Sequence, residues 1–223
     1  MEKLNRSIIK CQKCSRLVKF RKKISKFKRK QYINEKYWGK PITGFGDINS
    51  RILIVGLAPA AHGGTRTGRV FTGDRSAEFL YKCLHKAKMS NQSTSENKND
   101  GLKLYNTYVT TALKCVPPGD KPTPLELKTC FKYFKEEINF FKNVKIIVAL
   151  GKIAFDACIE FYKETYFLRN KDYIFGHAKR YQLPDKKILI GCYHPSPRNV
   201  NTGRIDENKM IKLLVKVKKV MGR

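Results

Sequence analysis

Residues 52–74 read ILIVGLAPAAHGGTRTGRVFTGD, and they join a short apolar run to a long segment rich in glycine. The run 52–55 has the length and the aliphatic side chains of a strand that is buried on both faces. Segment 56–74, which we call the glycine-rich loop, carries five glycines and precedes a helix predicted to begin at Ser76, with that serine as its cap. Loops at the carboxyl ends of strands bind ligands in parallel α/β sheets. Because structureless loops of this length are usually functional, we interpret it as part of a binding site rather than a surface loop of chance composition.

Further apolar runs predict three more strands, and capped or amphipathic segments between them predict helices. The strands are expected at 105–114, 144–150 and 187–193, and the helices at 76–88, 123–141, 151–162 and 206–220. This alternation is typical of a parallel sheet between two helical layers. The sequence therefore predicts an α/β fold, a three-layer α/β/α sandwich with a central, mainly parallel four-stranded sheet. Residues 1–223 are expected to form one domain without an internal repeat, with the polar segment 90–101 as a mobile loop.

The chain is strongly basic. It has 47 lysine and arginine residues against 18 acidic ones, a formal net charge of +29 and a pI of about 10.0. Such an excess favours a polyanionic partner, and nucleic acid first. A protein adapted to high temperature also gains lysine, but it usually gains glutamate alongside. Basic residues are concentrated at 15–40, a segment that we call the basic arm, where apolar residues at helical spacing predict an amphipathic helix that tracks phosphates or, alternatively, exposes a solvated face.

No run of about 20 apolar residues is present, and the N-terminus lacks the apolar core of a signal peptide. We therefore expect an intracellular protein without a membrane partner. A monomer is expected. A sliding clamp is conceivable as a partner, but no clear clamp-binding peptide supports it.

Four of the seven cysteines suggest a metal centre. Cys11 and Cys14 form a C-x2-C pair, and Cys115 and Cys130 are separated by 14 residues. Four intracellular thiols in two groups are typical of either a zinc ion or a [4Fe–4S] cluster, and spacing alone leaves both open. The other three cysteines have apolar neighbours and fit buried core positions.

A second functional loop is predicted where the last strand ends, in the sequence HPSPRN at 194–199. The prolines restrict the backbone after His194, and an imidazole placed at a strand end is suited to acid–base or hydrogen-bonding chemistry. Parallel strands deliver their carboxyl ends to one edge, so this loop is expected to face the glycine-rich loop. The alternative is a histidine that only bonds locally.

Together, the glycine-rich loop, the four cysteines, KCVPPGDKPTP at 114–124 and HPSPRN resemble the uracil-DNA glycosylase superfamily. The similarity covers nearly the whole chain and is greatest to the fifth family, the type B enzymes of archaea and some bacteria. It implies a structural [4Fe–4S] cluster, with ligands Cys11, Cys14, Cys115 and Cys130, that ties the basic arm to the core. It also implies hydrolysis of the N-glycosidic bond of uracil, and of some deaminated purines such as hypoxanthine, in DNA.

The resemblance assigns roles to residues of both loops. His194 matches the donor to the oxygen of the departing base, and Phe71 matches the aromatic ring that stacks on the base. Asn199 is expected to contact the sugar-phosphate near the scissile bond. The backbone around Gly56, Leu57, Ala60 and Ala61 is expected to line the base pocket.

Two positions depart from the better-known pattern of the superfamily. Leu57 stands where several sister families have an acidic, water-activating residue, so Asp74 is the proposed substitute; alternatively, Asp74 only holds the loop by accepting hydrogen bonds. The strand asparagine that reads uracil in sister families aligns with Thr111 or Ala112. Neither side chain offers the paired donor and acceptor of an amide, so looser base selection is expected.

Duplex binding requires a wedge beside the flipped base and clamps on the phosphates. Arg198 and Val200 are expected to enter the base stack, and Arg66, Arg69 and Ser196 to hold phosphates. No motif marks a Schiff-base lysine, which predicts a monofunctional glycosylase that leaves an abasic site. The alternative function is a non-catalytic, metal-stabilised nucleic-acid-binding module. A phosphate-binding NTPase is rejected because the loop lacks the G-x4-G-K-[ST] motif.

Overall fold

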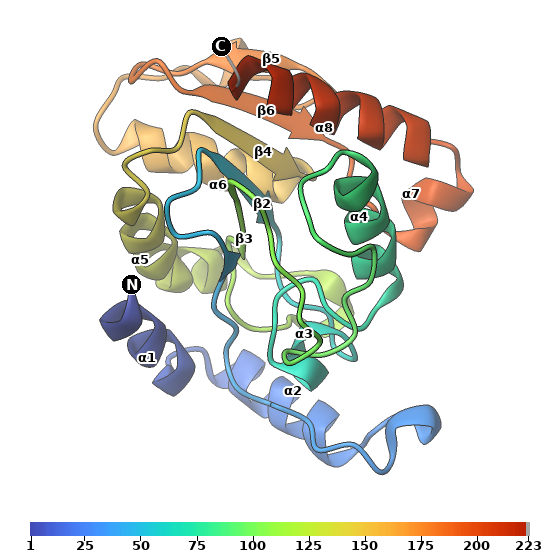
Figure 1. Ribbon diagram of the computed structural model, residues 1–223. Coiled ribbons are helices and arrows are strands. Elements are labelled where there is room, and N and C mark those ends of the chain that lie inside the picture. The colour runs from blue at the N-terminus through green and yellow to red at the C-terminus, as the bar shows by residue number, and fades with distance from the viewer. Residues whose placement is uncertain (222–223) are drawn as a thin grey trace.

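Six strands form one sheet in the order β1-β3-β2-β4-β6-β5 in the computed structural model, which describes residues 1–221 (Figure 1). The inner strands β3, β2, β4 and β6 pair in parallel, and β1 and β5 pair antiparallel at the two edges. The predicted sandwich and its four strands are confirmed, but the expected strand count is wrong. The edge strands are too short for their periodicity to be seen in the sequence. The strands are β1 (Phe45–Gly46), β2 (Ile52–Gly56), β3 (Thr107–Thr111), β4 (Ile146–Leu150), β5 (Arg180–Gln182) and β6 (Ile188–Cys192).

Two helical layers cover the sheet because its inner strands are apolar on both faces. Ile52 and Ile54 of β2 pack in one core with α4 (Arg75–Lys86) and α8 (Glu207–Met221). Leu53 and Val55 point the other way, into a core with α5 (Pro124–Phe140) and α6 (Lys152–Lys163). The continuous apolar run 52–55 is thus explained by burial on both sides.

The basic arm lies at one end of the sheet and is attached by a third, smaller core (Figure 1). In this core, Ile8 of α1 (Glu2–Lys10) and Leu17 of α2 (Ser15–Lys26) pack against Leu113, Cys130 and Tyr133. The amphipathic helix predicted in the arm is therefore confirmed as α2. The remaining short elements are α3 (Gly64–Thr67), α7 (Pro197–Asn201), η1 (Lys30–Tyr32), η2 (Pro118–Asp120) and η3 (Asn170–Asp172). None of the helices formed by residues 1–221 has the length and apolar character needed to cross a bilayer.

The strand order places a topological switch point beside β2. The chain passes from β2 to β3 on one side, and then crosses to β4 and β6 on the other side. Ligands of open parallel sheets bind at the carboxyl ends of strands next to such a reversal. The glycine-rich loop leaves β2 at this point, and the loop that begins at Tyr193 leaves β6 at the same edge.

The polar segment 90–101 is tied to the core, contrary to the mobile loop that the sequence predicted. The Arg69 guanidinium donates to both carboxylate oxygens of Asp100, over 2.8 and 2.6 Å, and to the Ser95 hydroxyl over 2.9 Å. Both charged side chains are more than nine-tenths buried. The arginine holds the pKa of Asp100 down, at about 2, although burial alone would raise it.

We predict that Asp100→Asn lowers the free energy of unfolding by about 3 kcal/mol, because it leaves a buried guanidinium without a counter-ion. Urea unfolding at neutral pH measures this change. The matched control is Asp172→Asn, which removes an exposed partner of Arg169 and should cost less than about 1 kcal/mol. Equal effects of the two substitutions would show that the Arg69 pair does not hold the segment.

Candidate functional site

A cavity of about 430 Å³ lies at the edge of the sheet where β2, β4 and β6 have their carboxyl ends, and we call it the site cavity. The glycine-rich loop contributes Leu57, Phe71 and Asp74 to its lining, and the loop after β6 contributes His194 and Arg198. An adjacent cavity of about 560 Å³ shares Ala60, Asp74, Ser76, Asp120 and Pro197 with it. The two loops that the sequence singled out therefore line one hollow.

Phe71 and His194 are brought together across this cavity. Their ring centroids lie 6.0 Å apart, with the ring planes inclined by 31°. Phe71 has a left-handed backbone, with φ of 46°, which is uncommon for a bulky residue and marks a site held in place by its surroundings. Gly56 makes this placement possible, since a Cβ atom there would lie 2.7 Å from the Phe71 ring. Gly56 thus contributes to the site by letting the Phe71 ring pack directly against its backbone.

His194 is neutral at physiological pH. Burial lowers its pKa to about 4. Its backbone carbonyl accepts a hydrogen bond of 2.9 Å from the Asn199 side chain, which fixes the loop after β6. Gly151 follows β4 beside the His194 Cβ, and its φ of 96° is a left-handed backbone that favours glycine. The imidazole can therefore donate one N–H into the cavity without carrying a charge.

Asp74 is the N-cap of α4, a position that the sequence assigned to Ser76. The Asp74 Oδ1 accepts the backbone N–H of Ala77 over 3.0 Å. Oδ2 lies against Gly63, where a Cβ atom would come within 1.8 Å of it. Burial raises the pKa of Asp74, and hydrogen bonds from the amides of Ala77 and Ser76 oppose this shift. Asp74 thus has a structural contact through one oxygen and also lines the site cavity.

Arg66 and Arg69 are buried within the glycine-rich loop instead of extending from it. Arg66 is ion-paired with Glu35 of the basic arm, donates to the Gly73 carbonyl over 2.9 Å, and lies 3.9 Å over the ring of Tyr32. Arg69 is engaged by Asp100. Both guanidinium groups point into the protein, so they support the shape of the loop.

The other predicted residues are distributed around the site. Thr111 is buried and its hydroxyl donates to the Leu113 carbonyl over 2.9 Å, and it is not among the residues that line the site cavity. Ala61 lines the adjacent cavity. Val200 is partly buried against the core, and the Ser196 side chain caps α7. Arg198 lines the site cavity, and its side chain is exposed to solvent.

Two features of the site were missed by reasoning from the sequence. Asp120 lines both cavities and has a left-handed backbone, with φ of 56°; its place in the proline-stiffened loop 115–124 was the available signal. Tyr32, Tyr37 and His62 form an aromatic group, in which the Tyr37 hydroxyl and the His62 Nδ1 are 2.9 Å apart and Tyr32 stacks on the imidazole. This group joins the basic arm to the glycine-rich loop.

The four predicted metal ligands, Cys11, Cys14, Cys115 and Cys130, line one small cavity of about 20 Å³ between the arm and the core. Burial raises the pKa of Cys115 to about 12 and of Cys130 to about 11, so both thiols would be protonated in the absence of a cation. Within residues 1–221, no three histidine, cysteine or acidic side chains are arranged as ligands of a single metal ion. The four cysteines share this cavity, and their role as metal ligands stays a prediction.

Comparison with known proteins points to one family. The model of the uracil DNA glycosylase superfamily matches residues 43–218. A type-5 uracil-DNA glycosylase of Thermus thermophilus is 41% identical over 212 residues, which are 95% of this chain and 94% of that protein. A type-5 uracil-DNA glycosylase of Pyrobaculum aerophilum is 38% identical over 93% of this chain and 87% of its own. A type-4 uracil-DNA glycosylase of Thermotoga maritima is 30% identical over 51% of each chain.

We predict that the imidazole of His194 titrates near pH 4, well below the ordinary histidine value of 6.5. Because the unfolded chain then binds more protons between these two pH values, His194 lowers the stability of the fold as the pH falls from 6.5 through 4. NMR titration of the imidazole signals, assigned by comparison with His194→Ala, tests this. A midpoint near 6.5 for His194 would contradict the burial described above.

Proposed function

This chain belongs to the uracil DNA glycosylase superfamily, and on that basis we propose that it is a DNA-repair glycosylase that removes uracil from DNA. The reaction is hydrolysis of the N-glycosyl bond, which leaves an abasic site. One observation carries the proposal for this site: the rings of Phe71 and His194 face a common cavity that Asp74 also lines. Binding alone would require none of these three side chains, which argues against a non-catalytic nucleic-acid-binding module.

The base must leave the duplex before the site can act on it. Flipping a nucleotide costs a few kcal/mol, and contacts in the pocket offset that cost. The site cavity, at about 430 Å³, falls in the size range of small-molecule pockets. Phe71 stacks on the flipped base, and its fixed backbone means that the ring is already in position when the base arrives.

His194 stabilises the departing base. Cleavage leaves the bonding electron pair on the base, and negative charge develops on a base oxygen. A neutral imidazole donates its N–H to that oxygen, and the low pKa of His194 keeps it neutral. Asn199 acts as a positioning residue, because its side chain holds the His194 carbonyl. The contact of Asn199 with the sugar-phosphate, expected from the resemblance, stays a prediction.

Asp74 activates the water and faces the positive charge on the sugar. The attacking water forms a bond to the sugar carbon and passes its proton to the carboxylate. A raised pKa makes Asp74 a better proton acceptor than an exposed aspartate. Asp120, at the rim of the same cavity, is the second carboxylate available to orient this water.

The substrate range extends to hypoxanthine and other deaminated bases. Leu57 is among the residues lining the site cavity, whereas the Thr111 hydroxyl is used by the backbone of its own segment. Neither supplies the paired hydrogen bonds that would restrict the pocket to uracil. A site that hydrogen-bonds a base less completely rejects analogues less strongly.

The duplex is held by exposed groups around the site. Arg198 is the exposed cation at the cavity and binds phosphate or enters the stack. For Arg66 and Arg69 we propose a positioning role, since both are buried and paired within the protein. Ser196 and Val200 shape the loop that presents Arg198. The enzyme acts as a monomer on DNA inside the cell.

The donor set fits a [4Fe–4S] cluster held by Cys11, Cys14, Cys115 and Cys130. All four thiols border one space, and the elevated pKa values of the buried ones call for a cation that stabilises their thiolates. A cluster binds each thiolate through a different iron, so it requires no single point of convergence. When bound, it supplies a structural link between the basic arm, β3 and α5. The reaction itself is carried by the residues of the site cavity.

We predict that duplex oligonucleotides with one uracil or one hypoxanthine acquire alkali-sensitive breaks when incubated with the protein. Asp74→Asn should slow this by about 10² to 10⁴-fold, because asparagine still caps α4 but accepts no proton. His194→Ala should slow it by about 10² to 10³-fold through loss of the donor. Single-turnover cleavage assays measure both effects.

The matched control is His85→Ala, an exposed residue of α4 that lines neither cavity, and it should cleave at nearly the wild-type rate. Full activity in Asp74→Asn would refute the water-activating role. Binding of DNA without any cleavage by the wild type would support the binding module instead. Borohydride should trap no covalent complex, because water is the nucleophile.

We predict that anaerobically purified protein carries about four irons and four sulfides per chain. Cys115→Ser should lose this iron and its brown colour, whereas Cys158→Ala, which alters a buried core cysteine, should keep both. Metal and sulfide analysis provides the readout independently of catalysis. One zinc per chain would show that the site is a zinc centre.

A further inference from the structure

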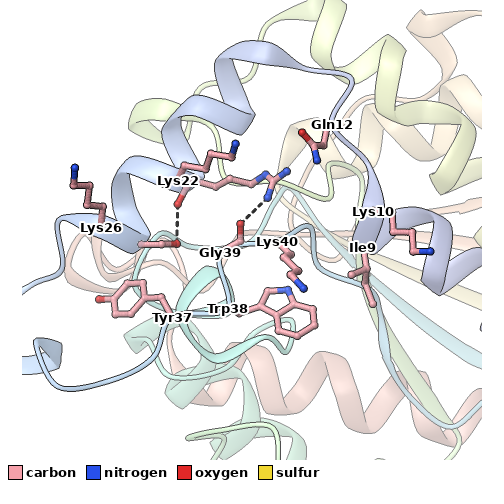
Figure 2. A pocket seen from close by; sticks show the side chains of 11 residues that line it. Ile9, Lys10, Gln12, Lys22, Lys26, Tyr37, Trp38, Gly39 and Lys40 are labelled. Atoms are coloured by element: carbon pink, nitrogen blue, oxygen red, sulfur yellow. Dashed lines mark hydrogen bonds between the residues drawn. The ribbon is translucent and has the colours of Figure 1, made fainter.

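A cavity of about 710 Å³ lies on the basic arm, away from the site cavity, and we call it the arm cavity (Figure 2). It is bordered by the turn between α1 and α2, by one face of α2 and by residues 37–40. It shares no lining residue with the site cavity. The function proposed above makes no use of it.

The lining of the arm cavity is cationic. Figure 2 shows Lys22 and Lys26 on one side and Lys10 on the other, with Lys40 and Trp38 between them. The four lysines are exposed, and none of them forms an ion pair with any acidic residue in the part of the chain that the structure describes. Among the described residues that line the cavity, none is acidic. An anion entering this space would meet attraction from several sides.

Arg21 adds a buried positive charge to the wall of the arm cavity. It is only 5% exposed. Its guanidinium donates to the carbonyls of Gly39 and Cys11, over 2.6 and 3.2 Å, while its Nε has no hydrogen-bond partner within residues 1–221. No carboxylate of those residues forms an ion pair with it. The Cys115 thiol is also near this guanidinium, which opposes the rise that burial causes in the pKa of that thiol, so Arg21 adds positive potential to the wall while the exposed lysines are the groups free to bind an anion.

The chemistry of the cavity favours phosphate over a nucleobase. Trp38 is the residue on which a base would stack, but its indole N–H donates to the Pro41 carbonyl over 3.1 Å and part of its ring lies against Gly68. The amino groups of Lys40 and Lys98 lie over the ring, 5.4 and 5.5 Å from its centroid. The indole therefore helps to hold ammonium groups in place, and those groups are suited to a phosphodiester.

The arm cavity is connected to the candidate site through the aromatic group. Tyr37 lines the arm cavity, and its hydroxyl contacts His62, which lines the adjacent cavity. That cavity in turn shares Asp74 and Asp120 with the site cavity. We propose that the arm cavity is a second, sequence-independent site for the DNA backbone, which holds the duplex at a distance from the flipped base. This inference rests on the proposed function for the identity of the polyanion.

The test is DNA binding by a triple variant, Lys22→Gln, Lys26→Gln and Lys40→Gln, whose exposed side chains can change without disturbing the core. Fluorescence anisotropy on an undamaged duplex of roughly 30 base pairs, about three helical turns, is measured over a range of salt concentrations. The slope of log affinity against log salt should fall in magnitude by about 2 to 3, because each lost phosphate contact removes nearly one released counter-ion. Affinity at low salt should fall at least about tenfold.

The matched control removes the same charge elsewhere, as Lys142→Gln, Lys145→Gln and Lys171→Gln. These exposed lysines lie just after α5, just before β4 and in η3, and none lines the arm or site cavity. The control should keep the wild-type slope to within about 0.5. Equal slopes in the two triple variants would overturn the proposal, and would mean that Arg21 only balances the charge of the nearby thiolates.

Excision kinetics separate this inference from the proposed function. With saturating enzyme, the control triple variant should cleave a uracil duplex at the wild-type single-turnover rate, because it leaves both the arm cavity and the site cavity intact. A slope difference without excision by the wild type would support the arm site and refute the glycosylase. Excision by the wild type with equal salt slopes in the two triple variants would support the glycosylase and refute the arm site.

Discussion

The parallel pairing of β2 with both β3 and β4 is the constraint on which the rest of the molecule depends. It buries the run 52–55 between two helical layers, and it places the chain reversal beside the carboxyl end of β2. The glycine-rich loop can leave the sheet only at this edge, where β6 delivers His194. Hydrophobic burial thus brings together two loops more than one hundred residues apart, and the glycine at 56 leaves room for the Phe71 ring.

Much of this arrangement could be predicted because it depends on periodicity and on strand ends. The four inner strands, the helix of the basic arm and the meeting of the two loops all follow from apolar runs and parallel topology. Ionic partners were less predictable. Arg66 and Arg69 look like phosphate ligands in a basic sequence, but each is paired with an acid in another segment. Asp74, not Ser76, caps α4, since both types are good caps and only backbone geometry selects between them.

For the cysteines, too, the sequence predicted which residues lie together but not which residues surround them. Two pairs far apart in the chain suggested one centre, and the four thiols do line one small cavity. Spacing does not show, however, that this centre lies beside Arg21, whose Nη2 bonds the Cys11 carbonyl and whose side chain borders the arm cavity. Arg21 therefore contacts both Cys11 and the arm cavity. Through this one residue the basic arm connects the cavity lined by the four cysteines with the cationic arm cavity.

The two ion pairs of the glycine-rich loop have a further consequence for how the pocket forms. Arg66 pairs with Glu35, and Arg69 pairs with Asp100, each across 31 residues of chain, one toward the N-terminus and one toward the C-terminus. The shape of the pocket therefore depends on contacts that are not local in the sequence, and a fragment with the loop but without both flanks would lack both ion pairs. The Ser95 hydroxyl also donates to the Phe71 carbonyl, so segment 90–101 supports the backbone that carries this ring. The side of the site cavity that carries Phe71 therefore forms only when segments on both sides of the glycine-rich loop have folded.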